Sequence, residues 1–137
     1  MDLVKAAFLP ASLSVGIPLI DDQHADLFAR LAALKEISLA RNHVPDDELD
    51  SLLDFLAEHF ATEEQMAREA NLSFDAHIRT HNAVLRGIRR LAGLVHEGDA
   101  DVYGLIKYIE YWFEKHILDE DKHLAFNLQQ YAAFAGN

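Results

Sequence analysis

Six side chains that can bind a metal ion stand where the helical pattern of the chain predicts apolar residues. They are five histidines and one glutamate: His24, His59, Glu63, His77, His81 and His116. The apolar face of a helix normally enters the core, and a carboxylate or imidazole buried there without a partner is unfavourable. A metal ion would satisfy these groups, since imidazoles and carboxylates bind iron, copper, zinc and manganese.

The spacing of these residues also favours a metal site. His59 and Glu63 are four residues apart, as are His77 and His81, and this spacing stacks two side chains on one helix face. Five histidines exceed what one ion normally takes from a protein, and carboxylates can bridge two ions. The residues alone therefore predict a buried, histidine-rich dinuclear site and leave the identity of the metal open.

The other three histidines are interpreted as non-ligands. His43 stands in a break beside Pro45, and His96 lies near the end of a predicted helix, where a positive charge suits the helix dipole. His123 follows His116 by seven residues and shares its face two turns on, but we favour a non-ligand there too. A single histidine on an apolar stripe is usually a hydrogen-bonded core residue, whereas six such residues on four stripes are hard to obtain by chance.

Four segments with helical periodicity must position these side chains. They span residues 21–41, 46–70, 73–97 and 101–118, the last continuing less regularly to about residue 130. Asp46 and Ser73 are candidate N-caps, and Asn71 suits a left-handed position after a helix. Short breaks make neighbouring helices antiparallel. We expect a single all-α domain over residues 1–137, an up-down-up-down four-helix bundle preceded by an N-terminal arm of residues 1–20.

The predicted topology brings the metal-binding residues to one height in the bundle. His24 and the pair His77 and His81 lie early in the first and third segments, whereas His59 and His116 lie late in the second and fourth. Antiparallel packing sets early positions of one helix beside late positions of its neighbours. All four helices therefore point ligands at one region.

Composition excludes several other classes of function. The chain has 137 residues, half of them hydrophobic, and no cysteine, which excludes disulfides, zinc–thiolate sites, iron–sulfur clusters and a thiol nucleophile. A formal net charge of −11 argues against binding to nucleic acid or an anionic membrane. An acidic surface suits solubility and a transient basic protein partner.

The first twenty residues do not resemble a signal peptide. Lys5 is the only basic residue there, Asp2 offsets its charge, and Pro10 interrupts the apolar stretch. No apolar run approaches the roughly 20 residues that span a bilayer. We therefore expect an ordered N-terminal arm, no membrane insertion and a cytoplasmic, monomeric protein.

Four motifs resemble the signatures of the hemerythrins, in the same order. They are residues 21–28 (DDQHADLF), 59–66 (HFATEEQM), 77–81 (HIRTH) and 112–121 (WFEKHILDED). Together they cover nearly the whole chain, and its length resembles that of a single-domain bacteriohemerythrin. Similar bacterial proteins usually carry a tryptophan in the arm, where this chain has Leu9, and that difference could loosen the arm or open a path to the site.

The resemblance implies two iron ions joined by an oxo or hydroxo bridge. The implied ligands are His77, His81 and His116 for one iron, His24 and His59 for the other, and Glu63 and Asp121 bridging both. Asp121 strains simple geometry, because on an ideal helix it is rotated by about 140° from His116. A local irregularity would reconcile the two, and Glu120 is the alternative ligand.

The implied activity is reversible binding of dioxygen, for storage, delivery or sensing, with no enzymatic turnover. Dioxygen would bind at the iron held by His24 and His59. The expected wall of the oxygen pocket is apolar: Leu27, Phe28, Phe60, Trp112, Phe113 and Ile117. The alternatives are a di-iron oxidase or peroxidase, a nitric oxide binding protein and an iron-storage protein, although no second iron site is evident.

Overall fold

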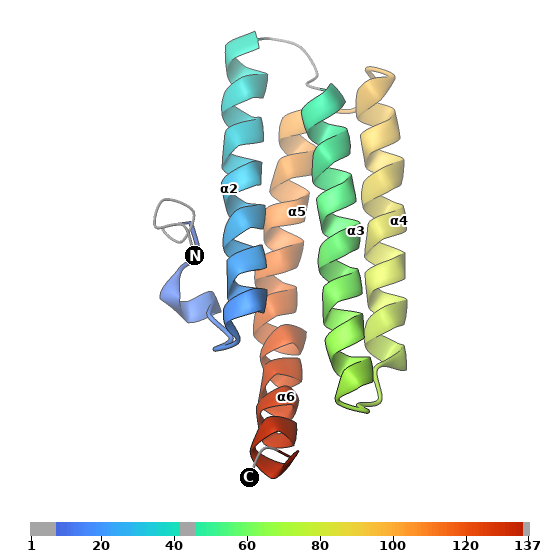
Figure 1. Cartoon of the computed structure of the whole chain (residues 1–137). Helices are drawn as coiled ribbons and strands as arrows, with labels where there is room; N and C mark the ends of the chain where they lie inside the picture. Colours follow the sequence, from blue (N-terminus) through green and yellow to red (C-terminus); the bar gives the residue numbers. More distant parts are fainter. Residues whose placement is uncertain (1–7, 42–45, 136–137) are drawn as a thin grey trace.

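The computed structural model describes residues 8–41 and 46–135 (Figure 1), and these are almost entirely helical. The α-helices are α2 (Pro18–Arg41), α3 (Asp46–Glu69), α4 (Asp75–His96), α5 (Val102–His116) and α6 (Lys122–Ala135). A short 3-10 helix, η1 (Ala11–Leu13), precedes them, and a π-helical segment, η2 (Ile117–Asp121), joins α5 to α6. The described residues contain no strand, which confirms the all-α prediction.

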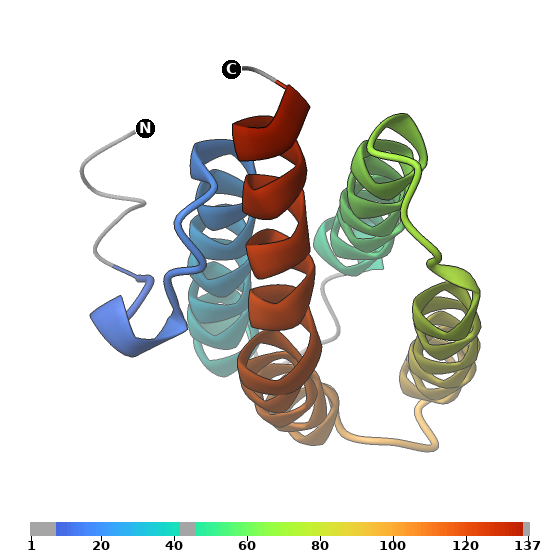
Figure 2. The same cartoon turned by 90° about the horizontal axis from the view of Figure 1, so that it is seen from below.

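The helices form an antiparallel four-helix bundle. Helix α2 packs against α3 and α5, and α4 packs against the same two helices. Figure 2 shows the bundle end-on, with α5, η2 and α6 running on as one long helix. This fourth helix extends past the end of the bundle, where α6 also contacts α3.

Apolar stripes of all four helices meet in one main core. Its fully buried members include Leu31, Leu56, Ile88 and Ile106, and burial of each such side chain contributes about 1.5–3 kcal/mol. Two smaller apolar clusters lie toward the end of the bundle where the histidines gather. One contains Leu13, Val15, Ile20, Ile117 and Ala125, and the other contains Ala67, Phe74 and Leu124.

Two helix starts differ from the sequence-based prediction. Helix α2 begins at Pro18, not at residue 21, because proline suits the first helical position, where its fixed φ and missing N–H carry no penalty. Helix α4 begins at Asp75 after Phe74, with no side-chain cap, so Ser73 is not the N-cap. Phe74 is buried in an apolar cluster, and this packing fixes the start of the helix. Asn71 has φ +57°, confirming its left-handed conformation.

The N-terminal arm is anchored to the start of α2. The Asp21 carboxylate accepts hydrogen bonds from Ser14 Oγ at 2.7 Å, Val15 N at 2.8 Å and Gly16 N at 3.2 Å. Gly16 has φ +82°, and a Cβ atom there would lie 3.1 Å from Gln129 Nε2, so both the turn and its contact with α6 favour glycine. Leu9 is partly buried against the cluster formed by this arm.

Length and hydropathy argue against a membrane span in the described part of the chain. None of the helices in residues 8–41 and 46–135 combines the length and the apolar character needed to cross a bilayer. The apolar residues of these long helices pack against one another in the bundle core.

Candidate metal centre

The structure brings all seven predicted site residues together at one end of the bundle core. Their ligand atoms form two groups, within each of which every atom lies within 4.8 Å of the others. The three-histidine group contains Glu63, His77, His81, His116 and Asp121. The two-histidine group contains His24, His59, Glu63 and Asp121. The two groups therefore share Glu63 and Asp121.

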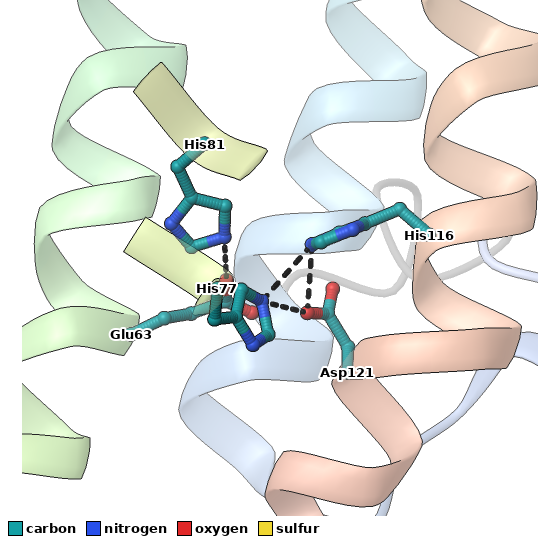
Figure 3. A group of neighbouring side chains, drawn as sticks. All are labelled: Glu63, His77, His81, His116 and Asp121. Carbon is teal, nitrogen blue, oxygen red and sulfur yellow. Dashed lines mark hydrogen bonds and ion pairs between the residues drawn. The ribbon is translucent and has the colours of Figure 1, made fainter. Parts of the chain in front are cut away.

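Side chains of the three-histidine group point toward one another from α3, α4 and the long fourth helix (Figure 3). His116 Nε2 lies 3.2 Å from His77 Nε2 and 3.1 Å from Asp121 Oδ1. His81 Nε2 lies 3.2 Å from Glu63 Oε1. His77 is 11% exposed, whereas the carboxylates of Glu63 and Asp121 are fully buried.

The two-histidine group links α2 and α3 to the same carboxylates. His24 Nε2 lies 3.1 Å from His59 Nε2 and 3.1 Å from Asp121 Oδ2. Glu63 Oε2 lies 4.0 Å from His24 Nε2 and 3.7 Å from His59 Nε2. Both histidines are buried almost completely, so this side of the centre is closed to bulk water.

The π-helical segment η2 directs Asp121 into the centre. It spans Ile117–Asp121 and follows His116 directly. A π turn hydrogen-bonds residues five apart, so His116 and Asp121 can share a face that an α-helix would not give them. Asp121 is fully buried, and Glu120 is 39% exposed. This π-helical segment is the local irregularity that was needed to bring Asp121 onto the same face as His116.

The residues present fit a pair of metal ions. Both oxygens of Glu63 and both oxygens of Asp121 are buried without a hydrogen-bond partner, as is His81 Nε2. The pairs of facing Nε2 atoms lie 3.1 and 3.2 Å apart. Two nitrogens bound at right angles to one ion, each about 2.1 Å from it, would lie about 3.0 Å apart. Imidazole and carboxylate ligands suit iron among other metals.

Three outer residues hold the ligand imidazoles from behind, a role that the sequence patterns did not predict for them. Gln23 Oε1 lies 2.7 Å from His59 Nδ1, and Glu64 Oε2 lies 3.1 Å from His81 Nδ1. Glu120 Oε2 lies 3.4 Å from His116 Nδ1. Such partners fix the ring orientation and leave Nε2 free for a metal. The only sequence feature that could have indicated this role is that each of the three residues is next to a candidate ligand in the chain.

The electrostatics of the centre follow from burial and crowding. Burial, with the neighbouring histidines, lowers the pKa of His59 to about 3 and that of His81 to about 2. Burial and the nearby Asp121 raise the pKa of Glu63. Burial alone would raise the pKa of Asp121 too, but the facing imidazoles, His116 foremost, bring it below its ordinary value. His59 and His81 are thus neutral near pH 7, as metal ligands must be.

The six residues predicted to line an oxygen pocket all lie in or against the apolar clusters of the bundle. Leu27, Phe60 and Phe113 are buried in the main core, and Ile117 is buried in the cluster under the arm. Phe28 is partly buried against both clusters. The Phe60 and Phe113 rings lie 5.8 and 6.2 Å from the His59 ring. Phe60 also stacks on the His81 ring at 4.0 Å, so it borders both groups. Trp112 instead stacks on His116 at 4.4 Å, so it borders the three-histidine group.

Two of the remaining histidines, His96 and His123, are described by the structure and belong to neither ligand group. His96 ends α4 and bonds to Asp46 and Asp50 on α3, which raises its pKa. His123 is exposed and lines a surface pocket of about 290 Å³ beside His77 and Glu120. His43 lies outside the described residues.

Comparisons with known proteins agree on one family. A sequence model of the Hemerythrin HHE cation binding domain matches residues 15–125. The bacteriohemerythrin of Methylococcus capsulatus is 27% identical over 115 residues, which make up 82% of this chain and 88% of that protein. A hemerythrin-like protein of Naegleria gruberi is 32% identical over 112 residues, 81% of this chain and 84% of that protein. No solved structure gives a significant match.

The region that matches the family carries the whole candidate centre. Residues 15–125 include all seven members of the two ligand groups and the three outer residues behind them. A buried cluster of histidine, glutamate and aspartate is also what a cation-binding domain requires. From its sequence match and its metal-binding bundle, this chain belongs to the hemerythrin family.

Proposed function

We propose that this protein holds two iron ions in its two ligand groups and binds dioxygen reversibly there. The overlap of the groups carries the proposal, because Glu63 and Asp121 belong to both and are buried without hydrogen bonds. Membership of the hemerythrin family and the names of the bacteriohemerythrin relatives support iron as the metal.

In this proposal the histidines divide between the two irons. His77, His81 and His116 hold one iron, and His24 and His59 hold the other. Glu63 and Asp121 would serve both irons, since each belongs to both ligand groups. When bound, the two irons would supply the electrons needed for reversible binding of dioxygen. We place dioxygen on the side of His24 and His59, because that group offers one histidine fewer.

The surroundings of His59 favour reversible binding. The rings of Phe60 and Phe113 lie beside it. Leu27, three residues after His24 on α2, is fully buried in the same apolar core as these two rings. An apolar wall keeps water and proton donors away from the reacting atoms. We propose that these three residues slow the irreversible oxidation of the centre.

The balance of ligands also opposes further reaction of the dioxygen. Five imidazoles and only two carboxylates make a less electron-rich centre than a carboxylate-dominated one. His59 and His81 stay neutral at physiological pH because their pKa values are low. We therefore favour a binding protein, serving storage, delivery or sensing of oxygen, over an oxidase or peroxidase.

The visible absorption spectrum of the iron-loaded protein tests this proposal. It is recorded after reduction without air, after adding air, and after removing the air again. We expect a charge-transfer band that appears with air and disappears on deoxygenation, with two irons bound per chain. A single irreversible change to a ferric spectrum would reject reversible binding, and sustained turnover of peroxide with a reductant would favour a peroxidase.

Two histidine variants make the spectrum specific to the site. His59→Gln removes one ligand of the two-histidine group and should abolish the reversible band. His123→Gln changes an exposed histidine outside both groups and should leave it unchanged. The same samples, exposed to nitric oxide in place of air, show whether that gas is bound in preference.

A further inference from the structure

Two of the three imidazoles in the three-histidine group face a carboxylate at Nδ1. His81 Nδ1 lies 3.1 Å from Glu64 Oε2, and the Glu64 side chain is 21% exposed. His116 Nδ1 lies 3.4 Å from Glu120 Oε2. A hydrogen bond from a neutral ring to an ionised carboxylate is roughly twice as strong as one to a neutral acceptor. Two ligands on this side therefore have anionic partners.

The two-histidine group has no anionic partner of this kind among the described residues. His59 Nδ1 lies 2.7 Å from the neutral amide oxygen of Gln23. His24 Nδ1 is buried and has no hydrogen-bond partner. The two halves of the centre thus differ in the charge behind their imidazoles as well as in the number of histidines.

The orientation of the Gln23 amide follows from its second contact. Gln23 Nε2 donates to Thr62 Oγ1 at 3.2 Å, and the Thr62 hydroxyl donates to the Glu58 carbonyl oxygen at 3.0 Å. The hydroxyl proton is thus in use, so Thr62 can only accept from the amide nitrogen. Gln23 must therefore present its oxygen to His59, which fixes the proton on Nδ1 and leaves the Nε2 lone pair for a metal.

A carboxylate behind an imidazole changes how strongly the ring donates to a metal. It draws the Nδ1 proton toward itself, which makes Nε2 more basic and stabilises a more highly charged ion. An amide oxygen orients the ring in the same way and lacks the full charge. The His59–Gln23 contact is shorter than the His81–Glu64 contact. The difference between Gln23 and Glu64 therefore lies in their charge and not in how firmly they orient the ring.

We propose that Glu64 and Gln23 are positioning residues that set the redox balance between the two irons. Glu64 acts through His81 to stabilise the ferric state at the three-histidine position. Gln23 acts through His59 and, because it is neutral, leaves the iron at the two-histidine position easily returned to the ferrous state. This inference rests on the proposed di-iron function and adds to it a cause for unequal redox preferences of the two iron positions.

Two near-isosteric substitutions of opposite sign test the inference on the full-length, iron-loaded protein. Glu64→Gln keeps an acceptor for His81 and removes the charge, whereas Gln23→Glu keeps an acceptor for His59 and adds one. In spectroelectrochemical titrations, we expect the oxidised-to-reduced ratio at a fixed potential to fall at least tenfold in Glu64→Gln. The ratio should rise by a similar factor in Gln23→Glu. Glu64→Asp, which retains the charge, should stay near wild type.

Matched controls separate these effects from a change in net charge. Glu69→Gln and Gln65→Glu make the same charge changes on exposed positions of α3, where the two side chains bond to each other. Both should leave the ratio within about twofold of wild type. If the site variants behave like these controls while two irons remain bound, the inference is wrong and the proposed function stands. Wild-type protein that fails to bind two irons overturns both.

A second measurement needs no redox change and serves a variant that binds iron poorly. In zinc-loaded protein, the Nδ1–H proton resonances of His81 and His59 report the strength of their hydrogen bonds. We expect the His81 resonance to move upfield in Glu64→Gln and the His59 resonance to move downfield in Gln23→Glu. Resonances that stay in place in both variants would contradict the proposed roles.

Discussion

Glu63 and Asp121 are buried carboxyl groups of the same centre with opposite pKa shifts. Burial and the charge of Asp121 raise the pKa of Glu63. Facing imidazoles outweigh burial at Asp121 and lower its pKa. In the iron-free protein, folding therefore favours the protonated form of Glu63 and the ionised form of Asp121, and a metal ion that uses both carboxylates competes with a proton at Glu63.

Replacing Glu63 by glutamine should separate stability from metal binding. Glu63→Gln removes the cost of protonating or burying a carboxylate, so we expect the iron-free protein to gain about 1–3 kcal/mol in free energy of unfolding at pH 7. The same change removes a shared ligand, and bound iron should fall below two per chain. Urea denaturation measures the stability and metal analysis measures the bound iron, with Glu69→Gln as an exposed control. A Glu63→Gln protein that is less stable and still binds two irons would contradict this account.

At the scale of elements, the π-helical segment and the N-terminal arm complete the centre. The segment Ile117–Asp121 adds one residue to a turn, which brings Asp121 onto the face of His116. The arm packs Leu13 and Val15 against Ile20 and Ile117, next to the start of this segment. Both elements act at the end of the bundle where the ligands lie.

Shortening the π-helical segment by one residue should preserve the metal centre. Deletion of Leu118, which is 49% exposed, would leave a regular helix with the aspartate four residues after His116, a spacing that shares one face. We expect iron content to stay near two per chain and stability to be unchanged or higher. Insertion of an alanine after Leu118 moves the aspartate off that face and should reduce bound iron. Metal analysis that finds the reverse order would reject this role of the segment.

Loss of the Asp21 carboxylate should release the arm. Asp21→Ala removes the acceptor of three hydrogen bonds from Ser14, Val15 and Gly16. Two of these donors are backbone N–H groups, so we expect the free energy of unfolding to fall by about 1–3 kcal/mol. Limited proteolysis should also cut near residue 14 sooner than in wild type. An unchanged cleavage rate would show that apolar packing alone holds the arm.

At the scale of the whole molecule, the bundle encloses an unfavourable polar centre in a favourable apolar core. The main core of leucine, isoleucine and valine side chains fills the bundle beyond the centre. The ligand groups leave buried atoms without hydrogen bonds, which lowers the stability of the iron-free chain. Metal binding therefore adds stability, because it satisfies groups that the fold holds in place.

Acid should destabilise the iron-free protein more steeply than an ordinary bundle. The pKa values of His59 and His81 are about 3 and about 2 when folded and about 6.5 when unfolded, so the unfolded chain binds more protons below pH 6.5. Each histidine then removes about 1.4 kcal/mol per pH unit, and the raised pKa of Glu63 acts in the opposite sense. We expect a net loss of stability from pH 6 to pH 5, because two histidines oppose one carboxyl group.

Urea denaturation of the iron-free protein at pH 7, 6 and 5 measures this dependence. Glu63→Gln lacks the opposing carboxyl and should lose stability more steeply over the same range, by up to about 2.7 kcal/mol per unit. A free energy of unfolding that stays constant from pH 7 to pH 5 would contradict the buried, neutral state of His59 and His81. The iron-loaded protein should release its metal over the same range, since protons compete for the ligands.

The amino-acid sequence alone specifies the fold class, the family and six of the seven candidate ligands. Apolar stripes at helical spacing predict the bundle, and histidines or a glutamate on those stripes stand out because they would be buried. Residue type and spacing are therefore enough to identify His24, His59 and Glu63 as candidate ligands. Asp121 came from the family resemblance alone, because an ideal helix would have turned it away from His116.

Contacts between helices determine the rest of the centre. A π-helical segment that helical periodicity does not predict turns Asp121 inward. Gln23 lies behind His59 and Glu64 behind His81, each on a different helix from its histidine, and no local pattern encodes how those helices approach. Trp112 stacks on His116. Periodicity specifies which face of a helix is buried, whereas the rotation and approach of packed helices determine which side chains meet.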